Sequence, residues 1–277
     1  MIRRVALPDG SDVPALGQGT WRMGEDARKR QQEGRALRLG LELGMTLIDT
    51  AEMYGDGGAE ELIGEALGDQ REQLFLVSKV YPQNAGRGRI ERACESSLRR
   101  LKTDRLDLYL LHWRGSVPLA ETVEGMQALI AAGKVLRWGV SNLDLDDMDE
   151  LIRAGGQACA ANQILYNVTE RGPEFELIPE LQRLGIPVMA YSPVGQGRLP
   201  RSAALTDAAE RHGASPFQIA LAWAMRRPDV IVIPKASDEA HVRDNRGAAD
   251  IVLTPDDLAA IDADFPPPHR RTRLAML

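Results

Sequence analysis

Residues 47–55 read Leu-Ile-Asp-Thr-Ala-Glu-Met-Tyr-Gly, a short apolar run that ends in an acid and is soon followed by a phenol. Two further apolar runs end at Lys79 and at His112. Short apolar runs of this kind are typical of buried parallel strands. In a closed barrel of parallel strands, all carboxyl ends meet at one face. We therefore expect Asp49, Tyr54, Lys79 and His112 to gather around one substrate.

Eight such segments recur along the chain, alternating with amphipathic stretches of helical period. In residues 90–101, for example, apolar side chains recur every three or four positions. This repeated alternation predicts an α/β fold, a single closed (β/α)8 TIM barrel with extra helices. An open doubly wound sheet is disfavoured, because its glycine-rich fingerprint is missing. The predicted strands are residues 15–19, 46–49, 74–79, 106–112, 136–141, 160–165, 187–191 and 230–234.

Turn and cap residues mark further elements. The Asp9-Gly10 pair between apolar residues predicts an N-terminal β-hairpin. The pairs Ser215-Pro216 and Thr254-Pro255 each place proline after an N-cap residue, which predicts two late helix starts. The proline- and arginine-rich residues 265–273 are too short to fold alone. We expect them either to drape over the barrel mouth or to fray.

The bulk composition is typical of a globular protein that acts on small molecules. At 277 residues the chain has the length of one barrel, so we expect a single domain over residues 1–277. The net charge is −6 without a basic run, which disfavours nucleic-acid and membrane-surface binding. No apolar run approaches a membrane span, and Cys94 and Cys159 lack metal-ligand or redox spacing. We expect a cytoplasmic protein with reduced cysteines, and a monomer.

Polar residues stand at the carboxyl ends of most predicted strands. Taken singly, each has an ordinary structural explanation: Lys79 could end a strand in solvent, Asp49 could cap a helix, and His112 could be a satisfied core histidine. Together they favour a site, because polar groups at these ends face the barrel mouth. The full set is Asp49, Lys79, His112, Ser141, Asn142, Gln163, Tyr191 and Lys235.

Tyr54 and three of these residues suit one mechanism. The Lys79 ammonium, held by the Asp49 carboxylate, would lie beside Tyr54. Because a cation favours the phenolate, we expect the pKa of Tyr54 to fall below its usual value of about 10. Such a phenol is a usable general acid. His112 can reach the mouth and hydrogen-bond a carbonyl oxygen.

The stretches around these residues resemble the aldo-keto reductase family from one end of the chain to the other. Asp49, Tyr54, Lys79 and His112 fill all four positions of that family's catalytic tetrad. The resemblance implies a reductase in which hydride passes from a nicotinamide to a carbonyl carbon while Tyr54 protonates the oxygen. The matching stretches are residues 47–55, 76–79, 106–112, 139–142, 162–163, 190–193 and 233–245.

The resemblance also implies that NADPH binds at the barrel mouth without a Rossmann motif. Amide side chains can satisfy the donor and the acceptor of a carboxamide, and an aromatic ring can support the nicotinamide face. The implied cofactor contacts are Gly19, Thr20, Trp21, Asp49, Ser141, Asn142, Gln163, Tyr191, Ser192, Pro193, Val194, Gly195, Gln196, Lys235, Ala236, Ser237, His241, Asp244 and Asn245.

Two positions near Lys235 depart from the family pattern. Lys235 matches the lysine that meets the ribose 2′-phosphate, but the next position, commonly serine, is Ala236. The position six beyond the lysine, commonly arginine, is His241. Losing a guanidinium weakens phosphate recognition, although Ser237, His241 or the nearby Arg243 stands near enough in sequence to compensate. We expect NADPH to be preferred over NADH.

The chain is most similar to short bacterial family members that reduce methylglyoxal, so we expect small aldehydes and 2-oxoaldehydes as substrates. Two other functions stay open: a non-catalytic nicotinamide-binding, redox-sensing module of the same fold, and a Schiff-base aldolase using Lys79. No metal is expected, since no second His or Cys stands at ligand spacing beside His112. The expected substrate-pocket walls are Trp21, Tyr54, His112 and Trp113.

Overall fold

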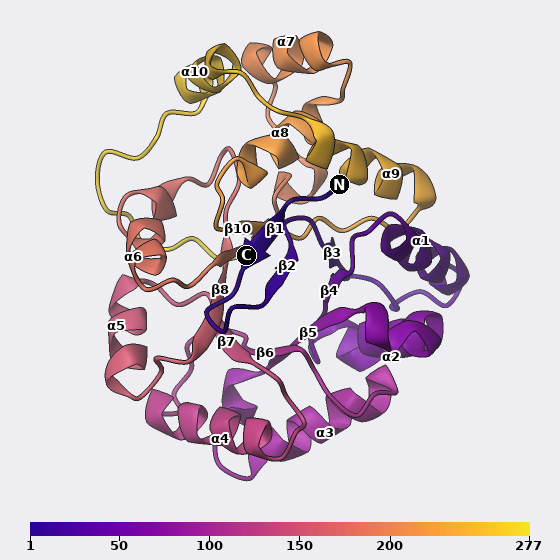
Figure 1. Ribbon diagram of the computed structural model, residues 1–277, viewed down its shortest axis with the longest axis vertical. Helices are drawn as coiled ribbons and strands as arrows, with labels where there is room; N and C mark the ends of the chain where they lie inside the picture. The colour runs from indigo at the N-terminus through magenta and orange to yellow at the C-terminus, as the bar shows by residue number, and fades with distance from the viewer.

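The computed structural model describes all 277 residues and shows eight parallel strands ringed by helices (Figure 1). Each strand pairs with the next along the chain, and the bridges Leu16–Val232 and Gly19–Lys235 join the first to the last. The predicted (β/α)8 TIM barrel is confirmed. The strands are β3 (Gln18–Gly19), β4 (Leu47–Asp49), β5 (Phe75–Val80), β6 (Leu108–Leu111), β7 (Trp138–Ser141), β8 (Cys159–Leu165), β9 (Val188–Tyr191) and β10 (Val230–Val232).

All eight predicted strands are present, with ends that differ by three residues or fewer from the prediction. The largest difference is at the closure of the barrel, where residues 15–17 precede β3. There Gly17 N donates to Val232 O, and Val232 N donates to Ala15 O. These residues still bond across the closure, but through isolated bridges rather than a regular ladder.

The inside of the barrel is a packed core in which Val77, Leu110 and Met189 are fully buried. The first and last strands approach so closely that glycine is required at the mouth. A Cβ on Gly19 would lie 2.8 Å from the carbonyl oxygen of Ile233, closer than real contacts allow. The absence of a side chain therefore lets the barrel close.

Helices follow the strands as predicted. Ile90, Cys94 and Leu98 are buried on the inner face of α3, and both capping boxes, at Ser215 and Thr254, are present. Both cysteines are unpaired and buried. The helices are α1 (Arg30–Glu42), α2 (Gly58–Leu67), α3 (Arg89–Leu101), α4 (Leu119–Ala131), α5 (Leu145–Arg153), α6 (Leu177–Arg183), α7 (Ala203–His212), α8 (Pro216–Met225), α9 (Glu239–Gly247) and α10 (Pro255–Asp264).

Two of these helices lie outside the ring, as the prediction of extra helices requires. Helix α7 packs on α8 of the ring, and α10 packs on α7, so α7 and α10 form an outer layer at the top of Figure 1. Helix α7 enters between β9 and its partner α8, and α10 follows α9. The layer lengthens the molecule without interrupting the barrel.

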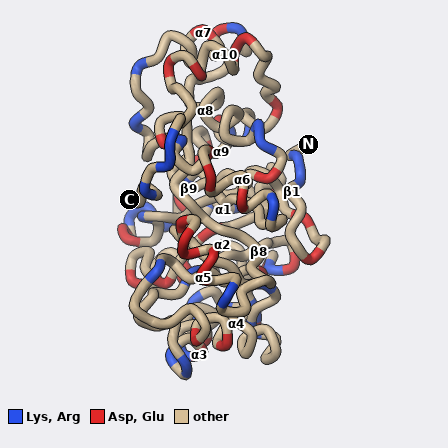
Figure 2. Tube along the Cα trace, turned by 90° about the vertical axis from the view of Figure 1, so that its left-hand side faces the viewer, with Lys and Arg blue, Asp and Glu red and all other residues tan.

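The predicted N-terminal hairpin is confirmed as β1 (Arg4–Ala6) paired antiparallel with β2 (Asp12–Pro14). It covers the amino ends of the barrel strands. The Arg3 guanidinium donates to the carbonyls of Arg227 and Pro228 just before β10, and Arg137 before β7 pairs with Asp9 at 2.6 Å. In the side view, the hairpin and the C-terminus lie on opposite sides (Figure 2).

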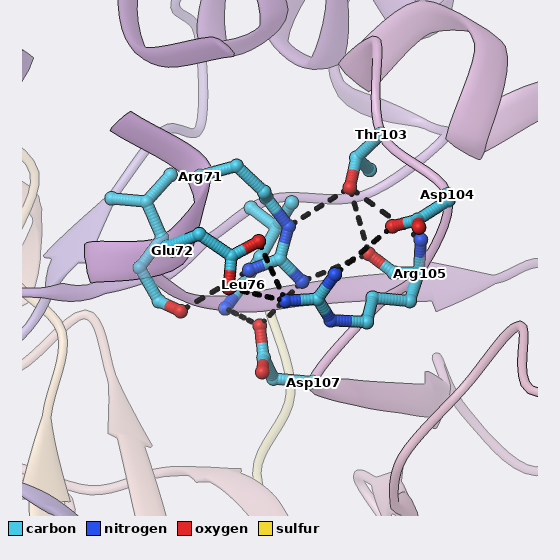
Figure 3. Close-up of polar contacts among 8 residues, drawn as sticks. Arg71, Glu72, Leu76, Thr103, Asp104, Arg105 and Asp107 are labelled. Atoms are coloured by element: carbon cyan, nitrogen blue, oxygen red, sulfur yellow. Dashed lines mark hydrogen bonds and ion pairs between the residues drawn. The ribbon is translucent and has the colours of Figure 1, made fainter. Parts of the chain in front are cut away.

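A polar network ties the amino ends of β5 and β6 together (Figure 3). The Asp107 carboxylate accepts from Leu76 N and from the Arg71 guanidinium, each at 2.8 Å. Arg71 also donates to Thr103 Oγ1 and to the carbonyl of Arg105, both at 2.9 Å. Because these bonds join backbone and side chains of neighbouring loops, they brace the end of the barrel away from the mouth.

The C-terminal tail is held against the barrel by contacts with other elements, so of the two expectations it drapes over the mouth rather than frays. Arg271 pairs with Asp146 at 2.7 Å and lies 3.7 Å from Glu176. At the end of the tail, Leu277 N lies 3.4 Å from the hydroxyl of Tyr191, the last residue of β9. The tail therefore crosses the carboxyl ends of the strands. No helix is long and apolar enough to cross a membrane.

Candidate active site

The four residues expected to act together do meet at the carboxyl ends of the strands. Lys79 of β5 directs its ammonium at three acceptors: Asp49 Oδ2 at 2.8 Å, the carbonyl of Thr50 at 2.8 Å and Tyr54 Oη at 3.1 Å. These use all three of its N–H donors. Because the Tyr54 hydroxyl accepts from the ammonium, its own proton is left to point at another acceptor.

Burial dominates the electrostatics of this cluster. Burial raises the pKa of Tyr54 above its ordinary value and outweighs Lys79, whose charge and hydrogen bond act to lower it. The expected lowering of the Tyr54 pKa is therefore wrong in direction, because the depth of the phenol outweighs its cation. For Lys79, burial acts to lower the pKa, but Asp49 and Tyr54 together raise it, so the ammonium stays charged. The phenol is a protonated donor steadied by a cation.

His112 lies next to the phenol as a neutral ring. Its ring centroid is 5.9 Å from that of Tyr54, edge to face. Burial, and then the charge of Lys79, lower its pKa to about 2. Its Nδ1 is buried without a partner. Because buried unpaired N–H groups are rarer than unpaired acceptors, we infer that the single proton sits on Nε2.

Three polar residues expected to hold a carboxamide form one hydrogen-bonded group. Asn142, in the left-handed conformation (φ 57°), donates through Nδ2 to the His112 carbonyl at 3.2 Å and to Ser141 Oγ at 3.1 Å. Ser141 Oγ in turn donates to the carbonyl of Gln163 at 2.9 Å. The amide Nε2 of Gln163 donates to Asp49 Oδ1 at 2.7 Å. This group is thus bonded directly to the cluster around Lys79.

Tyr191 joins the same group from β9. Its hydroxyl donates to Asn142 Oδ1 at 2.9 Å. Burial raises its pKa to about 12, against the backbone N–H of Leu277, which lowers it. The hydroxyl is thus a fixed neutral donor that holds the ring in place. A ring fixed at the mouth can support the flat face of a ligand.

Residues 192–196, a run of implied cofactor contacts, follow Tyr191 in a loop with unusual backbone geometry. Ser192, Gly195 and Gln196 have φ values of 47°, 57° and 58°, in the left-handed region. Asn167 Nδ2 donates to the carbonyl of Ser192 at 2.9 Å and anchors the start of the loop. The remaining predicted members, Pro193 and Val194, lie between, and Pro193 is buried.

Lys235 and Ser237 stand together beyond β10, with the Lys235 ammonium donating to the Ser237 hydroxyl. Burial, opposed by Glu33, lowers the pKa of Lys235, and the cations Lys29 and Arg22 lower it further. These two cations were missed by sequence reasoning, although basic residues are frequent in that segment. A group of cations at this point suits a phosphate.

The residues that depart from the family pattern lie beside this group. His241 is exposed on α9, and its Nδ1 lies 2.6 Å from Asp238, which caps the same helix. Ala236 is partly buried against the core. Asp244 accepts a hydrogen bond from Ser215 Oγ at 3.1 Å, which ties α9 to the start of α8. Asn245 follows Asp244 on the same helix.

An aromatic pair, Trp113 and Tyr81, lies on the His112 side of the tetrad. Trp113 lies 4.8 Å from the His112 ring and 5.8 Å from Tyr81, centroid to centroid. On the first loop, Thr20 Oγ1 donates to the carbonyl of Asp49 at 2.9 Å, and Trp21 stacks under the Arg22 guanidinium. No group of three or more His, Cys, Asp or Glu side chains is placed to hold a metal.

Comparisons with known proteins agree with this geometry. The model of the aldo/keto reductase family matches residues 15–264. The chain is 53% identical over 271 residues to methylglyoxal reductase YeaE of Escherichia coli, covering 96% of this chain and 95% of that protein. It is 32% identical to glyoxal reductase of Bacillus subtilis, covering 94% and 91%. A crystal structure of an aldo/keto reductase from Klebsiella pneumoniae with NADP and acetate superimposes with a TM-score of 0.97, at 51% identity over both full chains.

Proposed function

The chain belongs to the aldo/keto reductase family, and from this premise we propose that it reduces small aldehydes and 2-oxoaldehydes, methylglyoxal among them, with NADPH. One observation carries the proposal. The buried Lys79 ammonium donates to both Asp49 and Tyr54, so the phenol is held protonated with its hydrogen available. A positioned proton donor of this kind is what carbonyl reduction needs.

The protein residues supply the proton and the alignment. Tyr54 delivers its proton to the carbonyl oxygen, and the neighbouring ammonium of Lys79 stabilises the negative charge left on the phenol. His112, neutral with its proton on Nε2, donates a hydrogen bond to the same oxygen and orients the carbonyl. Bound NADPH supplies the hydride for the carbonyl carbon.

The residues at the mouth suit a nicotinamide cofactor. Gln163 Oε1 accepts no hydrogen bond from the chain, so it is an acceptor available to a carboxamide. Ser141 and Asn142 add polar atoms beside it, and Tyr191 offers a ring face. At the other end, Lys235 and its neighbouring cations suit the 2′-phosphate of NADPH rather than the hydroxyl of NADH.

The Schiff-base alternative conflicts with the state of Lys79. A lysine nucleophile must be uncharged, but the pKa of this lysine is raised and all three N–H donors are engaged. A redox-sensing module differs from the reductase only in turnover, so kinetics separate the two.

Steady-state consumption of NADPH tests the function. We expect efficient turnover of methylglyoxal and of nitrobenzaldehydes, weaker turnover of aldoses and keto-gulonates, and a lower kcat/KM with NADH. A protein that binds NADPH by fluorescence titration but turns over none of these carbonyls would favour the sensing module. Efficient sugar reduction beside negligible methylglyoxal turnover would remove the 2-oxoaldehyde assignment.

We also propose that the protein works as a single-domain monomer in the cytoplasm. The large exposed apolar side chains, such as Leu136, Phe217 and Val252, come from different segments of the chain, and we expect no large interface patch among them. Two buried free cysteines are compatible with a reducing compartment. Light scattering on the purified protein would give the mass of one chain, and a dimer mass would contradict the proposal.

A further inference from the structure

Gln163 makes a contact that its expected role does not require. It lies on β8, while Asp49 ends β4, 114 residues earlier in the chain. Both side chains are buried, and Gln163 Nε2 lies 2.7 Å from Asp49 Oδ1. The other carboxylate oxygen, Oδ2, accepts from Lys79 at 2.8 Å. The carboxylate is therefore held from two sides.

The chemistry fixes which way the amide points. An ionised carboxylate only accepts hydrogen bonds, so the NH2 end of Gln163 faces Asp49 and the oxygen end faces away. Its backbone carbonyl is also engaged, because it accepts from Asn142 N at 2.8 Å and from Ser141 Oγ at 2.9 Å. Gln163 thus bonds to the catalytic carboxylate and to the carboxamide group at once.

We propose that Gln163 is a positioning residue for the proton donor: it holds the Asp49 carboxylate against Lys79 and Tyr54, while its amide oxygen remains for the cofactor carboxamide. The inference rests on the proposed reductase function and deepens it. Through this amide, the residues that receive the cofactor and the residues that deliver the proton form one hydrogen-bonded unit.

The electrostatic consequence has a definite sign. The charge of Asp49 raises the pKa of Tyr54. The amide donor of Gln163 partly compensates that charge, so its removal leaves Tyr54 harder to ionise. A second carboxylate at this position would add to the effect. A glutamine that merely joined two strands would leave the ionisation of Tyr54 unchanged.

The test uses the protein without cofactor or substrate, labelled with 13C at the hydroxyl-bearing carbon of its five tyrosines. The Tyr54 signal is assigned from its loss in Tyr54→Phe, and its ionised fraction is compared at one alkaline pH above about 10. We expect that fraction to fall roughly twofold or more in Gln163→Met, and further in Gln163→Glu. Gln163→Glu is the closer match in shape and serves if the methionine variant does not fold.

Two controls separate positioning from cofactor contact. Ser141→Ala removes a neighbouring carboxamide contact but not the bond to Asp49, so it should weaken NADPH binding without moving the Tyr54 titration. In the Asp49→Asn background, Gln163→Met should cause no further change in that titration. In the loaded enzyme, Gln163→Met should lower kcat roughly 10- to 100-fold, the loss expected for a hydrogen bond to a charged group.

The proposal is overturned if folded Gln163 variants titrate like wild type, or if Gln163→Met acts equally with and without the Asp49 carboxylate. Because this titration needs no turnover, it is independent of the proposed function. A wild-type protein that reduced no carbonyl would end the reductase assignment whatever the titration gave.

Discussion

The two ends of the barrel use buried charge in opposite ways. At the amino ends, Arg71 and Asp107 are 11% and 13% exposed and bond mainly to backbone groups of neighbouring loops (Figure 3). At the carboxyl ends, Lys79 and Asp49 are 0% and 4% exposed, and the ammonium is shared with a phenol. The first pair braces the structure, whereas the second holds the phenol that we propose as the proton donor.

Non-glycine residues with left-handed backbone conformations gather at the mouth, although Lys102, before β6 at the amino ends, also has a φ of 54°. Asn142 and Ser192, both at the mouth, adopt left-handed conformations although neither is glycine. Such conformations cost free energy and persist where the surroundings impose them, which is common at functional sites. The mouth therefore carries the more deeply buried charge pair and more of the left-handed non-glycine residues than the amino ends do. Substitutions at the two ends should separate activity from stability.

The largest separation of turnover from stability is expected at the buried ion pair of the mouth, Lys79 and Asp49. Lys79→Met alone should lower both turnover and stability, because it leaves the Asp49 carboxylate uncompensated. Adding Asp49→Asn should restore the free energy of unfolding to at least near wild type, since buried pairs are often replaceable without loss. Turnover should stay roughly 10²- to 10⁴-fold below wild type. Urea unfolding and NADPH consumption measure the two quantities, and recovery of turnover together with stability would contradict the functional role.

The next effect concerns pH and His112. The pKa of His112 is about 2 in the folded protein, against 6.5 for an ordinary histidine. Above pH 6.5, His112 is neutral in both the folded and the unfolded protein. Below pH 6.5, His112 binds a proton in the unfolded chain but stays neutral in the folded protein. The free energy of unfolding should therefore fall by up to about 1.4 kcal/mol per pH unit below 6.5 from this residue.

Urea unfolding between neutral and mildly acidic pH measures this slope. His112→Gln should make it shallower, while His269→Gln, at an exposed position in the tail, is the matched control. An equal slope in wild type and His112→Gln would mean that the folded ring takes up its proton as readily as the unfolded chain does.

A smaller, purely structural effect is expected at the amino ends. Asp107→Asn should cost about 1–3 kcal/mol of unfolding free energy, because it weakens the bonds to Arg71 and Leu76. The kcat should stay unchanged. Asp104→Asn, whose side chain is 82% exposed, is the control and should change little. A large loss of turnover in Asp107→Asn would contradict the claim that the amino ends of the barrel serve stability and not activity.

Much of the fold and the tetrad could be predicted, because short apolar runs that end in Asp49, Lys79 and near His112 carry their own positional information. The direction in which the pKa of Tyr54 shifts could not be predicted, because it depends on how deeply the folded barrel buries the phenol. The bond between Gln163 and Asp49 joins residues far apart in sequence, and no local pattern encodes it.

The sequence also left open whether the C-terminal tail crosses the barrel mouth or frays. In the structure Arg271 pairs with acids on other elements, and Leu274 packs against the core. Such pairs between distant segments give no periodic signal. The cations Arg22 and Lys29 near Lys235 were missed for the same reason: the loop that carries them matches no motif.

The central claim is that the Tyr54 hydroxyl delivers the proton to the carbonyl oxygen. The most direct measurement is the kcat of Tyr54→Phe with NADPH and methylglyoxal, beside NADPH affinity measured by fluorescence. We expect a kcat roughly 10²- to 10⁴-fold below wild type with affinity nearly unchanged. A variant that reduces methylglyoxal at the wild-type rate would contradict it.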